Sequence, residues 1–299
     1  MQTRRTLLVD AFSAEPLAGN AAGVVPDGDL ATEQMRAVAR ELAVSETAFV
    51  QSSSSADRRL RFFTPTREID LCGHATIAAH AHLHRAGVVD AGTHTVETNV
   101  GVLDVDVEAD GTVWMTQDAP SVDSVELDYD RLGDALGVDP AAFRDVGASI
   151  PPAVASTGLP FLVVPVNFLE HLGGADPDLP AVEALTDEYD VAGVYVFTFD
   201  ALEADSTLHA RMFAPGIGIP EDPVTGTASG ACGAYLRHVD AFDGDVPDEM
   251  VFEQGHFVDR PGQVRVRVDT DVRVGGRAVT ALDGSLSIPP VQDDDILEA

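Results

Sequence analysis

The residue types best suited to moving a proton stand in two short segments near the N-terminus. "SETAFV" (45–50) places Glu46 directly before an apolar run, and "CGHAT" (72–76) places a thiol and an imidazole around a glycine. A carboxylate at the start of an apolar run needs either a partner that satisfies it or a chemical role. Beside a bound substrate it can take a proton from one carbon and return it to another. Spacing alone leaves both interpretations of Glu46 open.

The second of these segments has a partner in the other half of the chain. Residues 61–76, "RFFTPTREIDLCGHAT", are similar to residues 211–229, "RMFAPGIGIPEDPVTGTAS". The matched residues are Arg61, Phe63, Pro65, Gly73, Ala75 and Thr76 with Arg211, Phe213, Pro215, Gly226, Ala228 and Ser229. Because each copy follows an alternating strand pattern and precedes a run of small residues typical of a helix, the chain is read as two copies of one unit.

In both copies the glycine stands where a loop turns into a helix. Glycine permits a close approach of the backbone, and the free N–H groups of a first helical turn bind anions. We expect the backbone at Gly73, Ala75, Gly226 and Thr227 to bind the carboxylate of a small substrate. Two such helices, related by a pseudo-twofold axis, would face one cleft between two domains. The alternative is that both glycines are ordinary turn residues, and the duplication favours the binding site.

The remaining pattern predicts two similar halves. In each, a strongly curved sheet wraps around one main helix rich in small residues. The predicted helices are 31–43, 74–86, 178–188 and 227–238, and short alternating strands lie between them.

Composition excludes several classes of function. The 299 residues carry a formal net charge of −32, and all 18 basic residues are arginine. Nucleic acid and anionic membranes are therefore unsuitable partners, and lysine-dependent mechanisms are excluded. The first residues lack the apolar centre of a signal peptide, and no run approaches the length of a transmembrane helix, so we expect a cytoplasmic protein. The two cysteines form no disulfide framework or sulfur-rich metal motif.

Several segments together resemble the phenazine-biosynthesis isomerase-like (PhzF) family, which has a diaminopimelate epimerase-like fold. They are "DAFSAEPLAGNAAGVV" (10–25), "SETAFV" (45–50), "RFFTPTREIDLCGHAT" (61–76), "EDPVTGTASGA" (221–231) and "EQG" (253–255), in the order of the family. One departure is the "DRPG" (259–262) that follows "EQG", where these proteins commonly have Gly-Arg-Pro-Ser. The resemblance implies an α+β fold of two similar, pseudo-twofold-related domains, each a barrel-like mixed or antiparallel sheet around a central helix, with the active site between them. We expect an N-terminal barrel domain of residues 1–118 plus 281–299, with the C-terminal segment returning to it, and a C-terminal barrel domain of residues 119–280. The resemblance also implies a homodimeric isomerase that needs no cofactor.

The resemblance also implies roles for individual residues. Glu46 would be the general acid/base that moves a proton within a small carboxylate-bearing metabolite, with His74 and Asp222 in the same site. We expect Ser45 and Asn20 to contact the substrate. Taken alone, Asp222 reads equally well as a loop carboxylate or as the N-cap of the helix at Gly226. His80 and His84 have the i, i+4 spacing of zinc ligands, but no nearby glutamate completes a metalloprotease motif. We therefore expect packed or solvent-tipped histidines and no metal.

Two other functions stay open. The wider fold contains racemases with a cysteine before each of the two glycines, and here Cys72 precedes Gly73 whereas Thr225 precedes Gly226. A threonine hydroxyl is a poor acid/base at neutral pH. Cys232, the second cysteine, lies inside the following helix, away from that position. A racemase or epimerase would need Cys72 with another partner. The third interpretation is a non-catalytic small-molecule-binding protein.

The acidic, lysine-free composition predicts a halophilic protein whose stability depends on salt. Self-repulsion of a net charge of −32 opposes the compact state, and salt screens that repulsion. Thermal unfolding followed by circular dichroism should show a higher Tm in about 2 M KCl than in about 0.1 M KCl. An unchanged Tm would contradict the prediction.

Overall fold

The computed structural model of the protein describes residues 2–146 and 150–290. The chain divides into two compact units. The described residues of the first unit are 2–17, 21–113 and 277–290, and those of the second are 18–20, 114–146 and 150–276. The C-terminal segment thus returns to the first unit. Independent domains with boundaries after residues 118 and 280 stay a prediction, and its residues 291–299 lie outside the described part.

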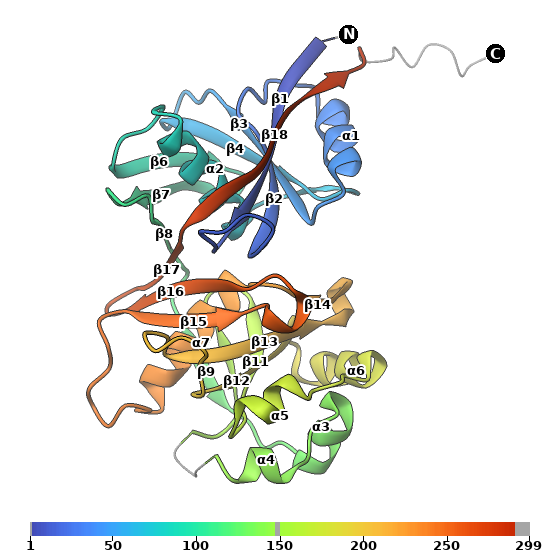
Figure 1. Ribbon diagram of the computed structural model, residues 1–299, viewed down its shortest axis with the longest axis vertical. Helices are drawn as coiled ribbons and strands as arrows, with labels where there is room; N and C mark the ends of the chain where they lie inside the picture. The colour runs from blue at the N-terminus through green and yellow to red at the C-terminus, as the bar shows by residue number, and fades with distance from the viewer. Residues whose placement is uncertain (1, 147–149, 291–299) are drawn as a thin grey trace, which may run out of the picture. The chain divides into compact units, whose positions relative to one another are not determined.

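The first unit is built from strands that follow one another closely, with two helices. Its elements are β1 (Gln2–Ala11), β2 (Asn20–Val25), α1 (Thr32–Leu42), β3 (Glu46–Gln51), β4 (Arg58–Phe63), β5 (Glu68–Ile69), α2 (Gly73–Arg85), β6 (Gly92–Thr98), β7 (Gly101–Val107) and β18 (Ala278–Ile288). β18 pairs antiparallel with β1, so the last described strand lies beside the first (Figure 1). β8 (Val113–Thr116) leads into the second unit.

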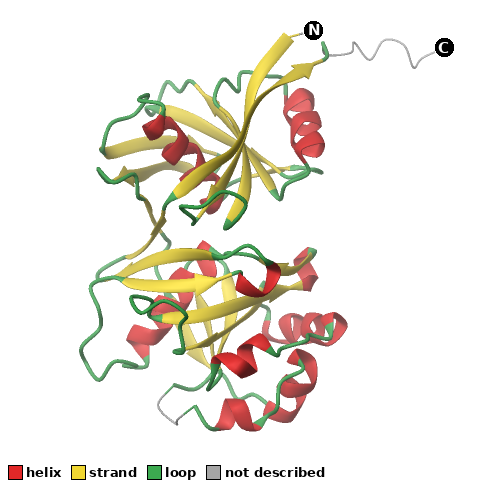
Figure 2. Cartoon of the chain, viewed as in Figure 1, coloured by secondary structure: helices red, strands yellow, loops and turns green. Residues whose placement is uncertain are grey.

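Helix α2 is buried on all sides. Nine consecutive residues, 75–83, are buried, whereas a helix on a sheet surface would bury only one face. The helix contacts β1, β3, β7 and β18, and Figure 2 shows it within the strands of this unit. Four of the nine buried residues are alanine, which lets surrounding strands approach the helix backbone closely. The sheet therefore wraps around the helix, as predicted.

The second unit repeats this arrangement and adds an outer layer of helices. Its strands are β9 (Ser121–Ser124), β10 (Ala153–Ser156), β11 (Pro160–Pro165), β12 (Gly193–Thr198), β13 (Leu208–Ala214), β14 (Ile219–Asp222), β15 (Met250–Gln254), β16 (Gly262–Val268) and β17 (Val272–Gly276). Its helices are α3 (Tyr129–Leu136), α4 (Ala141–Arg144), α5 (Leu169–Gly173), α6 (Leu179–Tyr189), α7 (Gly226–His238) and the short 3-10 turns η1 (Pro215–Ile217) and η2 (His256–Val258). Helix α7 has nine consecutive buried residues, 228–236, and contacts β9, β10, β11, β16 and β17.

Strand pairing confirms the internal repeat and the α+β fold class. In the first unit β3 lies parallel to β2 and antiparallel to β4, and β4 lies parallel to β6. In the second unit β12 lies parallel to β11 and antiparallel to β13, and β13 lies parallel to β15. The two central helices have the same length of 13 residues and both begin at the predicted glycine. The mixed sheet that the resemblance implies is therefore present in each unit.

The pairing register shows which residue of the second unit corresponds to Glu46. Thr47 pairs with Phe63 on β4, and Val194 pairs with Phe213 on β13. Since Phe63 and Phe213 are matched in the repeat, Gly193 occupies the position of Glu46. A Cβ atom at Gly193 would lie 2.8 Å from the carbonyl oxygen of Phe213 and 2.9 Å from Sδ of Met212. Only the first unit has room for a side chain at this position.

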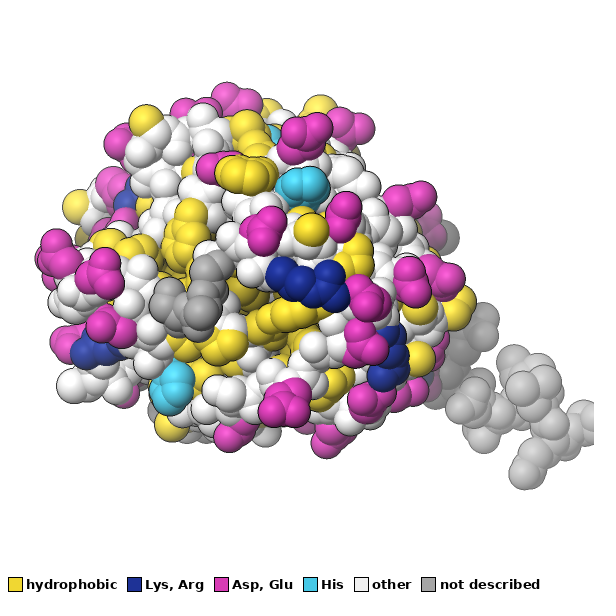
Figure 3. Space-filling view, turned by 90° about the horizontal axis from the view of Figure 1, so that it is seen from below, with side chains coloured by type: hydrophobic (Ala, Val, Ile, Leu, Met, Phe, Trp, Pro, Cys, Tyr) yellow, Lys and Arg dark blue, Asp and Glu magenta, His cyan; other side chains and the backbone are white. Residues whose placement is uncertain are grey.

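The surface agrees with the composition. In the view of Figure 3, Asp and Glu side chains are spread over the visible face, and Arg side chains are few. None of the helices in the described ranges combines the length and apolar character that crossing a membrane requires.

The close packing at Gly193 predicts a stability difference between two Gly→Ala changes. Gly193→Ala forces a methyl group against a backbone carbonyl and should lower the free energy of unfolding by about 1–3 kcal/mol. Gly73→Ala is the control, since no atom lies within 4 Å of an added Cβ there. Urea denaturation at fixed KCl measures both. Equal stability of the Gly193→Ala and Gly73→Ala variants would show that the backbone at Gly193 yields without cost.

Candidate active site

Glu46 is the first residue of β3, next to Ala22 on the parallel strand β2. Residues 47–50 are buried, and the Glu46 side chain is 17% exposed. The Glu46 carboxylate therefore lies at the end of the sheet and is only partly buried. Its Oε2 lies 3.3 Å from Nε2 of His74, whose side chain is 14% exposed. The partner of Glu46, which the sequence alone could not identify, is therefore the imidazole of His74.

His74 lies beside both a carboxylate and a thiol. It is the second residue of α2, and Cys72 is the N-cap of that helix. Sγ of Cys72 lies 3.5 Å from Nδ1 and 3.9 Å from Nε2 of His74, and one ligand atom of each of Glu46, Cys72 and His74 lies within 4.8 Å of the other two. With a neutral imidazole, Nε2–H can donate to the Glu46 carboxylate. The carboxylate, the imidazole and the thiol therefore form one compact cluster.

Burial lowers the pKa of His74 from its ordinary value, because the charged imidazolium loses solvation. The Glu46 carboxylate opposes this shift, and burial is the larger cause. The surroundings thus favour the neutral imidazole, which can both donate and accept a hydrogen bond.

The N-terminus of α2 lies open beside this cluster. Cys72 has an extended backbone (φ −142°, ψ 116°), but its side chain does not cap the helix. An added Cβ at Gly73 would meet no atom within 4 Å, so free space borders the first turn. Anion binding by the backbone at Gly73 and Ala75 stays a prediction. Ser45, also predicted to contact the substrate, is exposed, and its hydroxyl makes no hydrogen bond to any described residue.

The second unit contains a polar cluster at the start of α7. Nδ2 of Asn20 donates to Oδ1 of Asp222 (3.0 Å) and to the carbonyl oxygen of Val224 (2.9 Å). The Thr225 hydroxyl donates to Oδ2 of Asp222 (2.6 Å), and Nε2 of Gln254 donates to Oγ1 of Thr225 (3.1 Å). Oε1 of Gln254 accepts from the backbone N–H of Thr225 (3.1 Å). Each side chain is fixed by at least two partners, so the cluster is rigid.

This cluster explains why α7 also begins without a side-chain cap. Thr225 is the N-cap residue, but its hydroxyl is directed to Asp222 instead of to the first helical turn. The N-cap of α7 is therefore Thr225 and not Asp222, so the interpretation of Asp222 as the N-cap is wrong. The backbone at Gly226 and Thr227 lies in the uncapped turn. The carbonyl of Thr227 accepts a hydrogen bond from Thr157.

Sequence reasoning missed two members of this cluster. Gln254 and Thr225 hold Asp222 in place, yet neither was a predicted site residue. The signal for Gln254 was its place in "EQG" (253–255), at the end of β15. The signal for Thr225 is its position directly before the repeated glycine. At that position the comparison with racemases concerned only the absence of a cysteine.

The other candidate residues have structural surroundings. Cys232 is fully buried inside α7, and burial raises the pKa of its thiol well above the ordinary value. It is therefore no second acid/base. His80 is fully buried and pairs with the carbonyl of Thr76, and His84 pairs with the carbonyl of Val89. This agrees with the prediction of packed or solvent-tipped histidines, since His80 is buried and His84 is partly exposed.

Two groups within the described residues have side chains close enough to hold a metal ion. One is Glu46, Cys72 and His74, and the other is His209, Glu253 and His256. In the second group both carboxylate oxygens of Glu253 already accept backbone N–H groups, from Leu202 and Glu203. The prediction that the protein uses no metal stays a prediction.

Comparison with known proteins shows which family the chain belongs to. Residues 9–284 match the family described as phenazine biosynthesis-like protein. The chain belongs to the phenazine biosynthesis-like family. A relative from Bacillus subtilis, named an uncharacterized isomerase (YfhB), is 36% identical over 291 residues, which cover 95% of this chain and 96% of the relative. The chain is accordingly an isomerase.

Solved structures agree with this assignment. The crystal structure of a phenazine biosynthesis protein of the PhzF family from Bacillus anthracis matches with a TM-score of 0.86 at 32% identity, covering 96% of this chain and all of that one. A hydroxyproline epimerase from Agrobacterium vitis matches with a TM-score of 0.57 at 16% identity, covering 96% of this chain and 91% of that one. The second likeness shows a shared fold, in line with the predicted epimerase-like architecture.

The surroundings of His74 in this isomerase predict an unusual titration. Its pKa should lie below 6.5 in the native protein and fall further in Glu46→Gln, because the carboxylate that opposes the effect of burial is removed. NMR of the ¹⁵N-labelled imidazoles as a function of pH measures this, with His74→Asn to assign the signal. Glu41→Gln, on the exposed end of α1, is the matched control and should leave the pKa unchanged. A His74 pKa at or above 6.5 would contradict the prediction.

Proposed function

We propose that the protein moves a proton between two carbons of a small carboxylate-bearing metabolite, with Glu46 as the general acid/base. The contact between Glu46 and His74 beside the uncapped start of α2 is the observation that carries this proposal. It combines a base, a group that orients the base, and a place for a substrate carboxylate. Free space at Gly73 lets the substrate reach the helix backbone.

In the proposed reaction the substrate carboxylate binds the N–H groups at Gly73 and Ala75, where the helix dipole favours negative charge. Glu46 takes a proton from a carbon next to an unsaturated group and becomes neutral. The electron pair left on the substrate is delocalised toward that group. Glu46 then returns the proton to a different carbon on the same face. The bonds broken and formed are two C–H bonds and two O–H bonds, so no oxidant or reductant is needed.

His74 is proposed to serve the change of charge on Glu46. The neutral imidazole donates Nε2–H to the ionised carboxylate and holds it toward the substrate. When Glu46 carries the proton, the same contact can reverse, with the imidazole in its Nδ1–H tautomer and Nε2 accepting from the carboxylic acid. This support for both protonation states suits a residue that acts first as base and then as acid.

Asp222 and Asn20 are proposed to bind polar groups of the substrate. Oδ1 of Asp222 accepts a hydrogen bond from Asn20 and Oδ2 accepts one from Thr225, and a carboxylate oxygen can accept more than one hydrogen bond. A substrate hydroxyl or amino group is the donor that would match. Ser45, Gly226 and Thr227 stay proposed substrate contacts, and the homodimer and the absence of a cofactor stay part of the proposal.

A second candidate uses Cys72. Its thiol is 3.5 Å from an imidazole, and a thiol beside a histidine is the usual arrangement of an activated cysteine. Such a thiol could act as the acid/base of a racemase or epimerase. The Glu46 proposal and this one share His74 but predict opposite effects of two substitutions.

The experiment follows proton transfer in D₂O. Wild-type protein is incubated with a panel of small unsaturated carboxylates and of amino and hydroxy acids, and NMR detects isomerised or deuterated products. Glu46→Gln, which keeps the size of the side chain, should lower the rate by about 10²–10⁴-fold, the range for loss of a general base. Glu41→Gln is the control for loss of a carboxylate and should keep full activity.

Two further variants separate the alternatives. Cys72→Ala should keep most activity if Glu46 moves the proton and lose it if Cys72 does. Gly73→Ala should weaken substrate binding while leaving the fold intact, because the methyl group occupies the space beside the first turn. Retained activity of Glu46→Gln together with an inactive Cys72→Ala variant would overturn the assignment of Glu46.

A further inference from the structure

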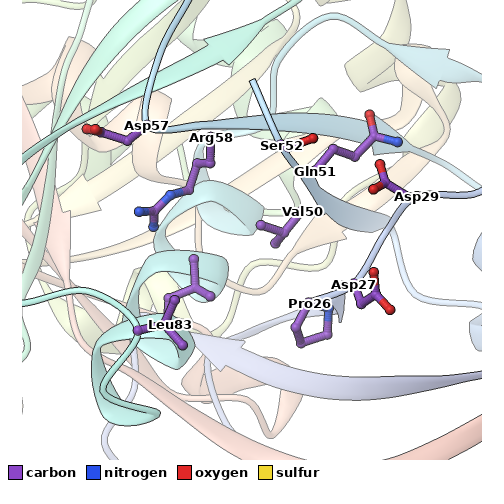
Figure 4. A pocket seen from close by; sticks show the side chains of 10 residues that line it. Pro26, Asp27, Asp29, Val50, Gln51, Ser52, Asp57, Arg58 and Leu83 are labelled. Carbon is purple, nitrogen blue, oxygen red and sulfur yellow. The ribbon is translucent and has the colours of Figure 1, made fainter. Parts of the chain in front are cut away.

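A cavity of about 270 Å³ lies in the first unit (Figure 4). It is away from the contact between Glu46 and His74. Gln51, which lines it, ends the strand that Glu46 begins, and five residue steps along a strand span about 17 Å. Leu83 lies near the C-terminus of α2, whereas His74 lies at its start. The cavity is therefore at the opposite end of the same two elements.

Arg58 makes this cavity unusual. It is the first residue of β4, and its guanidinium has no hydrogen bond or ion pair to any described residue. Nη1 of Arg58 is buried without a partner. On the same strand Arg59 is paired with Glu97 and Arg61 with Glu68. Burial lowers the pKa of Arg58, an effect that the nearby Asp57 carboxylate opposes.

The neighbouring carboxylate does not satisfy Arg58. Oδ2 of Asp57 instead accepts from the backbone N–H (2.8 Å) and the hydroxyl (3.0 Å) of Thr95. Figure 4 shows Arg58 at the cavity wall, between Asp57 and Leu83. A partly desolvated cation without a counter-ion at a cavity wall is a place where a ligand anion gains a charge-assisted hydrogen bond.

The walls of the cavity determine what kind of anion fits. Pro26, Val50, Leu83 and Val88 provide apolar surface, and Gln51 and Ser52 provide polar groups. The volume is just below the usual range for small-molecule pockets, which is about 300–1,000 Å³. An apolar body the size of a single ring or a short branched chain matches this space.

The charges at the rim limit the ligand to a single negative charge. Asp27, Asp29 and Asp57 also line the cavity, and the protein as a whole carries a net charge of −32. Asp27 lies 3.7 Å from Arg4, and the Asp57 carboxylate accepts hydrogen bonds from Thr95. A phosphate or a tricarboxylate would meet repulsion from them, whereas one carboxylate can pair with Arg58.

We propose that this cavity is a second ligand site of the enzyme, which binds a small apolar monocarboxylate through Arg58. The carboxylate accepts hydrogen bonds from the guanidinium, and the apolar body packs on Val50, Leu83 and Val88. This site is independent of the proposed reaction at Glu46, and its existence does not rest on that proposal.

The test uses benzoate as the probe and benzamide as its uncharged counterpart. In protein with ¹³C-labelled methyl groups, benzoate should shift the signals of Val50, Leu83 and Val88 at a fixed KCl concentration. Benzamide, which has the same shape, should cause shifts at least about tenfold smaller at equal concentration, a factor that corresponds to the loss of one charge-assisted hydrogen bond. Inorganic phosphate and citrate should cause none.

Two variants locate the anion. Arg58→Gln should abolish the benzoate shifts, and Arg36→Gln, which removes one exposed arginine from α1, should leave them unchanged. Benzoate at the start of α2 would instead shift the methyl groups of Ala75 and Thr76, and those shifts should persist in Arg58→Gln. Unchanged benzoate shifts at Val50 in Arg58→Gln, equal shifts with benzamide, or stronger binding of phosphate would overturn the proposal. Should Arg58→Gln fail to fold, the comparison of benzoate with benzamide in the wild type still decides.

Discussion

A helix that is buried on every side can offer its backbone to a ligand only at its ends. This constraint governs both units, because α2 and α7 each bury nine consecutive residues inside a wrapped sheet. The first N–H groups of such a helix need acceptors, and neither Cys72 nor Thr225 supplies one from its side chain. The uncapped starts of α2 and α7 are therefore two openings at which backbone N–H groups have no acceptor from the N-cap side chain. The side chains around each opening determine its chemistry.

The two openings share a backbone but differ in chemistry. In the first unit Glu46, His74 and Cys72 are close together, and all three can exchange protons. In the second unit the position of Glu46 is Gly193, where a side chain would meet Phe213 and Met212. There the groups at the helix start are Thr225, Asp222 and Gln254, which fix one another by hydrogen bonds. The duplication thus produced one unit suited to proton transfer and one suited to holding polar groups.

Much of the fold could be predicted because the internal repeat shows where the central helix of each unit begins. Matched glycines predicted helices at 74–86 and 227–238, and the structure has them at Gly73–Arg85 and Gly226–His238. The outer helices α3 and α5 were not predicted, since short amphipathic segments between loops resemble the loops themselves. Glu46 could be named from its family resemblance. Its contact with His74 could not come from spacing, because it depends on how β3 and α2 pack. The equivalence of Glu46 and Gly193 depends likewise on strand register.

The net charge of −32 raises the question of how the protein would hold an anion. Most of its partly buried arginines are already paired with carboxylates, as Arg61 is with Glu68 and Arg211 with Glu221. At the starts of α2 and α7 the attraction instead comes from backbone N–H groups, which carry no net charge and need no counter-ion. Salt that screens the acidic surface at long range acts less on such short, partly buried contacts. An anion site made of helix backbone is therefore compatible with an acidic surface in concentrated salt, where a cluster of exposed arginines would be screened. Arg58 differs from both groups: it has a charge, partial burial and no partner, and this combination makes its cavity the place where a single carboxylate has most to gain.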